Sequence, residues 1–345
     1  MSRIAVDAMG GDHGPAVVVD GIVEAAQRFA QHHIIVLGDE PQLQAEFSRH
    51  ATRPSNIEIM HAAEVVAMHD SPVDALRRKP DSSMRKMISL VKQGGCDAAF
   101  STGNTGAMVA GSTMLLGLLP GVRRSGIAIP MPTGDKPVIL VDVGANVECK
   151  AAHLYQYGLM AAVYAERVFG VKSPAVGLLN VGEEEGKGNQ LVKETRELFK
   201  ASRQVRYFGN VEGDDIFRGE CDVVVCDGFV GNIVLKTAEG ISELLMTKVG
   251  ELLKSVATAA AAAGGANAST ASGLRDTFKK LAARYDYAEY GGAPLLGVNG
   301  IVLIGHGRSN ARAVVNAIAY AGKMVAAGLN QALTAVVAES GVAAS

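Results

Sequence analysis

The sequence predicts an α/β fold: a three-layer α/β/α sandwich built on a mainly parallel (mixed) sheet. Short apolar runs alternate with segments of helical periodicity, a pattern typical of parallel strands joined by helices. Glycine is frequent, at 40 of 345 residues, against a usual share of ~7%. Such a share is expected where many strands end in tight turns. We therefore predict a single α/β/α catalytic domain over residues 1–345.

Six stretches of the chain have the form strand, loop, helix. In each, the apolar run ends in Gly, Asn, Ser or Asp, and helical periodicity follows. Ligands of parallel α/β sheets bind outside the carboxyl ends of the strands, so we expect the six loops to meet at one edge and form the site. The apolar runs are residues 4–6, 98–100, 138–143, 176–179, 223–225 and 301–304, and residues 57–61 are a further candidate strand.

The opening turn, DAMGGDHGP, lies between the first strand and the first helix. It lacks the G-x-G-x-x-G spacing of a dinucleotide site. Pro15 suits the first helical position, which makes Gly14 an N-cap without a side-chain acceptor. The first helical N–H groups are then available to water or to an anion. The alternative is that Gly10 and Gly11 only permit close packing.

Uncharged hydrogen-bond donors recur in the loops. Asparagine and threonine side chains beside helix N-termini favour the binding of an oxyanion such as phosphate. The alternative for each asparagine is turn formation, because Asn tolerates left-handed backbone geometry. The residues are Thr102, Thr105, Asn104, Asn146, Asn180, Asn189, Asn232 and Asn310.

Few basic residues lie in these loops. Lys187 stands between Gly186 and Gly188, which let the backbone bring it toward a ligand; a solvated loop lysine is the alternative. His13 and His306 lie in glycine-rich turns, where a structural role is the alternative to catalysis.

Composition and motifs argue against several functions. A net charge of −2, no tryptophan and 5% aromatic residues disfavour nucleic-acid binding. The sequence has no G-x-S-x-G elbow, no Walker A lysine, and no H-E-x-x-H or clustered Cys/His pattern for zinc. Magnesium at Asp7, Asp12, Asp142 and Asp227 stays open, but we predict that Asp7 and Asp142 fix loop backbones instead.

The four cysteines form no C-x-x-C pair, so we expect reduced, mostly buried thiols and a cytoplasmic protein. The first strand begins almost at once, which leaves no room for a signal peptide. No uninterrupted apolar stretch reaches ~18 residues, so we expect no transmembrane helix. Binding to a membrane surface stays open.

Residues 241–290 depart from the repeating pattern and predict a helical arm inserted into the domain. The segment begins as an amphipathic helix, ISELLMTKVGELLKSV, and passes through an Ala/Gly-rich stretch at residues 257–272. It resumes with an apolar face beside basic residues, which suits an anionic membrane surface. A contact with a second subunit or with a carrier protein is the alternative. The apolar face comprises Leu274, Phe278, Leu281 and Tyr285.

The final helix is predicted from Asn310 to about Glu339. It carries a stripe without charge, which we expect to be buried in the core or at a dimer interface. The stripe comprises Val314, Ile318, Val325 and Leu329.

Seven motifs occur in one order between residues 4 and 320: DAMGGDHGP, STGNTGA, DVGAN, LNVGEEEGKGN, NVEGDD, CDGFVGN and EYGGAPLLGVNG…GHG. Together they resemble the bacterial phosphate acyltransferase family (PlsX, or acyl-ACP:phosphate acyltransferase). The resemblance implies transfer of a long fatty acyl chain from acyl carrier protein to inorganic phosphate. The acyl phosphate product would feed phospholipid synthesis through a membrane glycerol-3-phosphate acyltransferase.

The resemblance also implies a fold like that of isocitrate and isopropylmalate dehydrogenases, a homodimer, and no nicotinamide or metal cofactor. It implies a cytoplasmic protein that associates peripherally with the membrane. Carried over by motif, Lys187 and Asn232 are the expected catalytic pair. The expected substrate-binding residues are Gly10, Gly11, Asp12, His13, Thr102, Gly103, Asn104, Thr105, Asn146, Asn180, Gly231 and His306.

The residues agree with this chemistry. Phosphate is itself the nucleophile, so no Ser or Cys nucleophile is required. Asn232 or loop N–H groups can stabilise charge on the thioester carbonyl, and Lys187 can orient the phosphate. Two other hypotheses stay open: a short-chain phosphate acetyltransferase or dehydrogenase of the same fold, and a non-enzymatic membrane-surface scaffold for lipid-synthesis enzymes.

Overall fold

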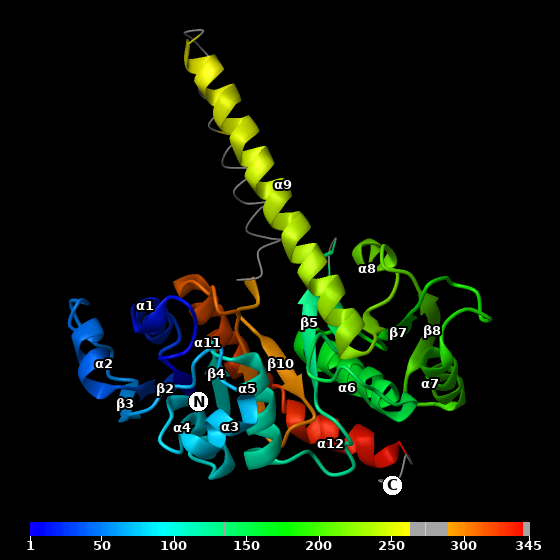
Figure 1. Ribbon diagram of the computed structural model, residues 1–345, viewed down its shortest axis with the longest axis horizontal. Helices are drawn as coiled ribbons and strands as arrows, with labels where there is room; N and C mark the ends of the chain where they lie inside the picture. Colours follow the sequence, from blue (N-terminus) through cyan, green and yellow to red (C-terminus); the bar gives the residue numbers. More distant parts are fainter. Residues whose placement is uncertain (134–135, 263–272, 274–288, 341–345) are drawn as a thin grey trace.

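The computed structural model describes residues 1–133, 136–262, 273 and 289–340. Within these residues, one eleven-stranded sheet forms the centre of the molecule, with helices on both faces (Figure 1). The strands are β1 (Ser2–Asp7), β2 (His32–Gly38), β3 (Ile57–His61), β4 (Ala98–Ser101), β5 (Gly126–Met131), β6 (Val138–Val141), β7 (Ala175–Leu179), β8 (Arg206–Val211), β9 (Val223–Val225), β10 (Ala293–Leu296) and β11 (Ile301–Ile304). The helices are α1 (Gly14–Arg28), α2 (Glu40–Phe47), α3 (Pro72–Arg78), α4 (Ser83–Lys92), α5 (Thr105–Gly111), α6 (Ala151–Phe169), α7 (Gln190–Ala201), α8 (Asp215–Arg218), α9 (Gly228–Ala262), α11 (Ala311–Ala326) and α12 (Leu329–Glu339), with a π-helical turn at Ser112–Leu116.

The strand order is β3-β2-β1-β4-β11-β10-β5-β6-β9-β7-β8. A first strand set, β3, β2, β1, β4 and β11, is parallel throughout, and so is a second strand set, β6, β9, β7 and β8. Between them, β10 and β5 are antiparallel to each neighbour. These three reversals make the two sets run in opposite directions.

The expectation that all six loops meet at one edge is therefore wrong. The loops after β1, β4 and β11 form a first loop group at the carboxyl ends of the first set. The loops after β6, β7 and β9 form a second loop group at the carboxyl ends of the second set. Apolar runs reveal strands, but they do not reveal strand direction, which here depends on the antiparallel pair β10 and β5.

The three layers follow from side-chain alternation along the strands. On β2, Ile34 and Val36 belong to one buried apolar cluster, and Ile35 and Leu37 belong to the other. Alternate strand residues point to opposite faces, so the two clusters mark the two faces of the sheet. Helices α1, α2, α6, α7, α11 and α12 cover the first face, and α3, α4, α5, α8 and the base of α9 cover the second. The predicted α/β/α sandwich is confirmed.

Two predicted helix boundaries change. Helix α1 begins at Gly14, one residue before the predicted start, and His13 takes the N-cap position without a side-chain cap bond. The single helix predicted to reach Glu339 is two helices, because Gly328 adopts φ +59°, a left-handed conformation that interrupts the helix. Its predicted apolar stripe lies in the core, with Val314 and Ile318 fully buried.

Helix α9 projects far beyond the body of the molecule (Figure 1). It begins at Gly228, well before the predicted arm at 241–290. Residues 263–272 and 274–288 of that arm, which include Leu274, Phe278, Leu281 and Tyr285, lie outside the described residues, so its boundaries stay a prediction. Among the helices that the structure describes, each is too short or too polar to cross a bilayer.

Candidate functional site

The first loop group is held together by close contacts between backbones. A Cβ on Gly10 would lie 2.7 Å from the Gly103 nitrogen, and the Thr102 hydroxyl donates to the Gly10 carbonyl at 3.1 Å. The Asp12 N–H donates to the carbonyl of Gly307 at 2.8 Å. The glycines of the opening turn are therefore required for loop packing. Asp12 and His13, by contrast, are exposed on this surface.

The strand-end carboxylates fix loop backbones, as predicted. Asp7 accepts from the Ser101 hydroxyl at 2.7 Å and from the Met9 N–H at 3.1 Å. Asp142 accepts the backbone N–H groups of residues 127, 144, 145 and 146 at 2.8–3.1 Å. Burial raises the pKa of both carboxyl groups, while these hydrogen bonds act in the opposite direction. Their role is to shape the loops.

Most of the asparagines form turns or caps. The Asn104 oxygen caps α5, and its amide donates to the carbonyls of residues 67, 68 and 70. Asn189 and Asn310 cap α7 and α11. The Asn180 amide donates to the Gly182 carbonyl, and the Asn146 amide donates to the Ser125 carbonyl and the Tyr157 hydroxyl. The turn-forming alternative thus accounts for the geometry of these side chains.

Asn232 is placed differently. It lies near the start of α9, is exposed, and its amide donates to the Val143 carbonyl at 3.1 Å. A Cβ on Gly144, where φ is +139°, would lie 3.1 Å from the Asn232 amide nitrogen. Beside it, Gly231 packs so closely on the Asp142 carbonyl that no side chain fits. The base of α9 therefore rests directly on the loop after β6 and presents Asn232 at its surface.

Lys187 extends from a strongly braced loop. Its N–H donates to the Glu184 carbonyl at 3.0 Å, and the Asn210 amide donates to the same carbonyl at 3.0 Å. The Arg196 guanidinium donates to the Glu185 carbonyl, and Lys200 pairs with the Glu185 carboxylate at 2.6 Å. Lys187 itself is exposed. The bracing role of Asn210 was not predicted, although its motif NVEGDD was noted.

Lys187 and Asn232 belong to the same loop group. Lys187 follows β7 and Asn232 follows β9, and these two strands are paired and parallel. Both residues therefore leave the sheet at the same edge. The strands that precede the first loop group run in the opposite direction.

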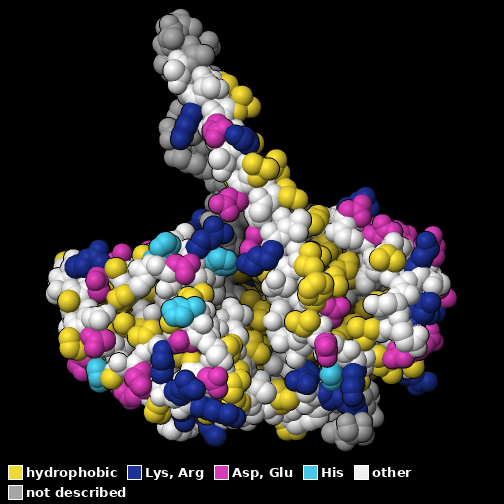
Figure 2. Space-filling view, viewed as in Figure 1, with side chains coloured by type: hydrophobic (Ala, Val, Ile, Leu, Met, Phe, Trp, Pro, Cys, Tyr) yellow, Lys and Arg dark blue, Asp and Glu magenta, His cyan; other side chains and the backbone are white. Residues whose placement is uncertain are grey.

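Two contacts join the first loop group to α9. The Nε2 of His306, in the loop after β11, lies 3.4 Å from the Lys236 Nζ, and Arg308 pairs with Glu243 at 3.5 Å. Burial and then the Lys236 charge lower the pKa of His306. Figure 2 shows basic and histidine side chains gathered beside the base of α9. His306 therefore lies where the half built on the first strand set meets the half built on the second.

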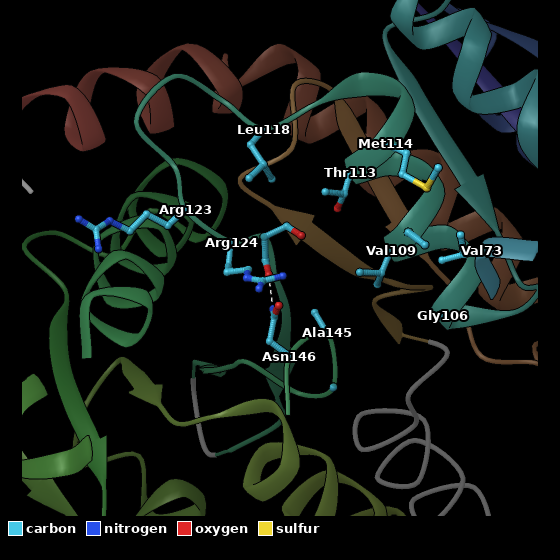
Figure 3. Close-up of a pocket in the computed structure, with 13 residues that line it drawn as sticks. Val73, Gly106, Val109, Thr113, Met114, Leu118, Arg123, Arg124, Ala145 and Asn146 are labelled. Atoms are coloured by element: carbon cyan, nitrogen blue, oxygen red, sulfur yellow. Dashed lines mark hydrogen bonds between the residues drawn. The ribbon is translucent and has the colours of Figure 1, made fainter. Parts of the chain in front are cut away.

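A pocket of ≈ 380 Å³ lies between the two halves on the second face of the sheet. Figure 3 shows Val73, Val109 and Met114 on one side of it, opposite Arg124 and Asn146. Its lining also includes residues 144 and 145, from the loop that supports Asn232. The pocket thus joins the segment that follows β4 to the second loop group, which sequence reasoning did not foresee.

The cysteines match the predicted reduced and mostly buried thiols. All four are free, and three are buried. Burial raises the pKa of Cys96 and Cys149 to about 11 and that of Cys221 to about 12. These thiols are neutral near pH 7. Among the described residues, no three His, Cys, Asp or Glu side chains are grouped to hold a metal.

The α/β/α fold of this chain is also found among phosphotransacylases and dehydrogenases. The chain matches a phosphotransacetylase from Streptococcus pyogenes with a TM-score of 0.62, over 94% of each chain and at 16% identity. It matches a 4-hydroxythreonine-4-phosphate dehydrogenase from Klebsiella pneumoniae with a TM-score of 0.54, over 94% of this chain and 100% of that one, at 14% identity. At such identities the likeness concerns the fold alone.

Sequence comparison defines the family. Residues 2–332 match the family described as "Fatty acid synthesis protein". The phosphate acyltransferase of Geobacter sulfurreducens is 47% identical over 332 residues, which cover 96% of this chain and 93% of the relative. The chain belongs to the phosphate acyltransferase family, as its ordered motifs predicted, and membership makes it an acyltransferase.

Proposed function

We propose that this chain transfers a long fatty acyl group from acyl carrier protein to inorganic phosphate. A phosphate oxygen attacks the thioester carbonyl carbon, and the carbon–sulfur bond breaks. The products are an acyl phosphate and the free thiol of the carrier. The observation that supports this most directly is the Asn232 amide, held over Gly144 at the border of the pocket.

Asn232 is proposed to stabilise the oxyanion. One N–H of its amide is held by the Val143 carbonyl, which orients the side chain. A primary amide carries a second N–H, which can donate to the oxygen of the thioester as negative charge develops on it. A donor oriented in advance lowers the barrier because it does not have to reorganise during the reaction.

Lys187 is proposed to hold and orient the phosphate. Its ammonium group supplies positive charge, and its loop is braced from α7 and β8, which supports a fixed position for the backbone. A thiolate with an ordinary pKa near ~8.5 leaves without a strong general acid. Positioning and electrostatics therefore supply most of the rate acceleration.

The first loop group is proposed as a further wall of the site. Its members are Gly10, Gly11, Asp12, His13, Thr102, Gly103, Thr105 and His306. The Lys236–His306 contact supports this proposal, because it brings the loop after β11 to the helix that carries Asn232. Asn104, Asn146 and Asn180 are proposed to act by shaping the loops.

We also propose a homodimer that pairs through α9. Apolar side chains repeat along this helix at intervals of four, four, three and four residues, at Ile241, Leu245, Val249, Leu252 and Val256, and each is more than a third exposed. Such a stripe is typical of a helix that packs against another helix. We further propose that the protein is cytoplasmic and attaches peripherally to the membrane. There it delivers its product to a membrane glycerol-3-phosphate acyltransferase.

The test is a reaction of the purified chain with palmitoyl carrier protein and phosphate. We expect acyl phosphate, trapped as a hydroxamate, and an equal amount of free carrier thiol. Parallel reactions with acetyl-CoA plus phosphate, and with NAD plus 4-hydroxythreonine 4-phosphate as the hydride donor, test the short-chain and dehydrogenase alternatives. Turnover of either one without turnover of palmitoyl carrier protein would refute the proposal, and so would a folded protein that is inert toward all three.

A further inference from the structure

The apolar wall of the pocket beside α5 has no role in the chemistry described so far. We propose that the pocket holds the hydrocarbon chain of the acyl substrate and that its α5 wall sets the preferred chain length. This proposal rests on the proposed function. The thioester carbonyl lies at the Gly144 end, next to Asn232, and the chain runs along α5 and the π-helical turn.

The composition of the pocket wall favours a hydrocarbon ligand. Val73, Val109 and Met114 line the side formed by α3, α5 and the π-helical turn, and Leu118 follows in the next loop. Val73 is 38% and Met114 50% exposed, so this wall is apolar surface still open to a ligand. Burying each methylene strengthens binding roughly fourfold. The volume of ≈ 380 Å³ falls in the range of small-molecule sites, which begins near ~300 Å³.

The polar side of the pocket, opposite the apolar wall, suits the carbonyl end of the acyl substrate. The side chains facing the apolar wall are Arg124 and Asn146 (Figure 3). Among the described residues, the lining includes no carboxylate. This suits the end of the substrate that becomes an anionic acyl phosphate. Gly144 both lines this end and contacts Asn232. The reacting carbonyl and the oxyanion donor are therefore adjacent when the chain lies along α5.

Chain length depends on the space beside Thr113 and Met114. Thr113 is exposed and lines the pocket at the π-helical turn. A phenylalanine there fills the space that the far end of a long chain occupies, while a short chain ends before it. Shortening Met114 to alanine enlarges the same region without crowding the core.

The experiment compares kcat/KM for octanoyl and palmitoyl carrier protein. For Thr113→Phe we expect the palmitoyl value to fall at least tenfold more than the octanoyl value. For Met114→Ala we expect the ratio to move toward longer chains. Thr52→Phe, at an exposed loop position far along the chain, is the matched control and should leave the ratio unchanged. Equal effects on both substrates, or none, would overturn the proposal.

Binding of a fluorescent fatty acid, cis-parinaric acid, separates this proposal from the proposed function. If the wild-type chain does not turn over palmitoyl carrier protein, the proposed function fails. The assignment of the pocket is then still tested by its affinity for cis-parinaric acid. We expect Thr113→Phe to weaken that affinity at least tenfold relative to Thr52→Phe. Unchanged affinity would overturn the pocket assignment. If Thr113→Phe does not fold, Met114→Ala decides the question by the same two measurements.

Discussion

Asparagine side chains have two kinds of role in this molecule: some cap helices, and one is a candidate catalytic group. Asn104, Asn189 and Asn310 cap helices with their side-chain oxygens. Asn232 instead lies within α9 and is held through its amide nitrogen by Val143. A cap directs the asparagine toward its own helix, whereas the Val143 contact directs Asn232 toward the loop after β6. Gly144 of that loop lines the pocket. Position relative to the helix start, rather than residue type, separates the candidate catalytic amide from the structural ones.

The proposed catalytic pair is tested by truncation. We expect Asn232→Ala to lower kcat by ~10²–10³, the usual effect of losing one oxyanion donor, and Lys187→Ala to act mainly by weakening the use of phosphate. Steady-state kinetics with varied phosphate separates the two effects. Lys172→Ala, at another exposed lysine, is the control. Near-normal rates in both site variants, with normal thermal unfolding, would remove the pair from the mechanism.

Gly144 provides a sharper test of how Asn232 is positioned. Its φ of +139° disfavours a side chain, and a Cβ would meet the Asn232 amide nitrogen at 3.1 Å. We expect Gly144→Ala to lower kcat by on the order of ten- to a hundredfold by displacing the amide. Gly240→Ala is the control, because Gly240 is exposed on α9 and a Cβ there meets nothing within 4 Å. Equal activity of the two variants would show that the Asn232 position is not critical.

Some of these roles follow from sequence and others do not. Asp7 and Asp142 were predicted to fix loops, because an aspartate at a strand end is followed by free backbone N–H groups. The contact of Asn232 with Val143 spans 89 positions, and that of Asn210 with Glu184 spans 26. No local pattern encodes such pairs, because they depend on which strands become neighbours.

The same limit applies to whole elements. Apolar runs located strands β3, β9 and β11 at their observed bounds. They did not reveal β2, β5, β8 or β10, and the antiparallel strands β10 and β5 decide that the two strand sets run in opposite directions. The pocket depends on that arrangement, because it lies where α5 of one half faces the loop after β6 of the other.

Helix α5 is predicted to depend strongly on Asn104. Asn104→Ala removes the cap and three donor bonds that anchor residues 67–70, so we expect a loss of about 2 kcal/mol in the free energy of unfolding. Asn189→Ala removes one exposed cap bond from α7 and should lose about 1 kcal/mol. Urea unfolding measures both. A larger loss for Asn189→Ala would contradict this account.

The contact between α9 and the loop after β11 is predicted to be sensitive to pH. Burial and the Lys236 charge lower the pKa of His306, so the unfolded chain binds this proton at a higher pH than the folded chain. As the pH falls below the ordinary value of about 6.5, the contribution of His306 to the free energy of unfolding therefore falls. Titration of the imidazole by NMR should show a higher pKa in Lys236→Gln than in the wild type. Lys248→Gln, at a lysine further along α9 that pairs with Glu251, should leave the pKa unchanged, and equal values in all three proteins would contradict the assignment.

At the scale of the whole molecule, α9 runs from the candidate site to a projection beyond the body of the protein (Figure 1). Its base carries Asn232 and contacts the loop after β11, while the rest of the helix extends away from both halves (Figure 1). Figure 2 shows apolar side chains along this extension. Among the described residues, each side chain of that stripe is left at least 37% exposed, so a partner or a surface against the stripe would stabilise this part of the helix.

A second copy of the chain is the proposed partner, and charge on the stripe tests it. Leu252 is 61% and Leu245 56% exposed, and in a dimer both would lose contact with water. We expect Leu245→Glu and Leu252→Glu to weaken the dimer at least tenfold, because an unpaired carboxylate would be buried at the seam. Light scattering during size-exclusion chromatography measures the mass. Thr247→Glu is the control, since two residues along a helix turn a side chain by about 200°, to the opposite face. A wild-type monomer, or dimers of equal strength in all variants, would rule out α9 as the seam.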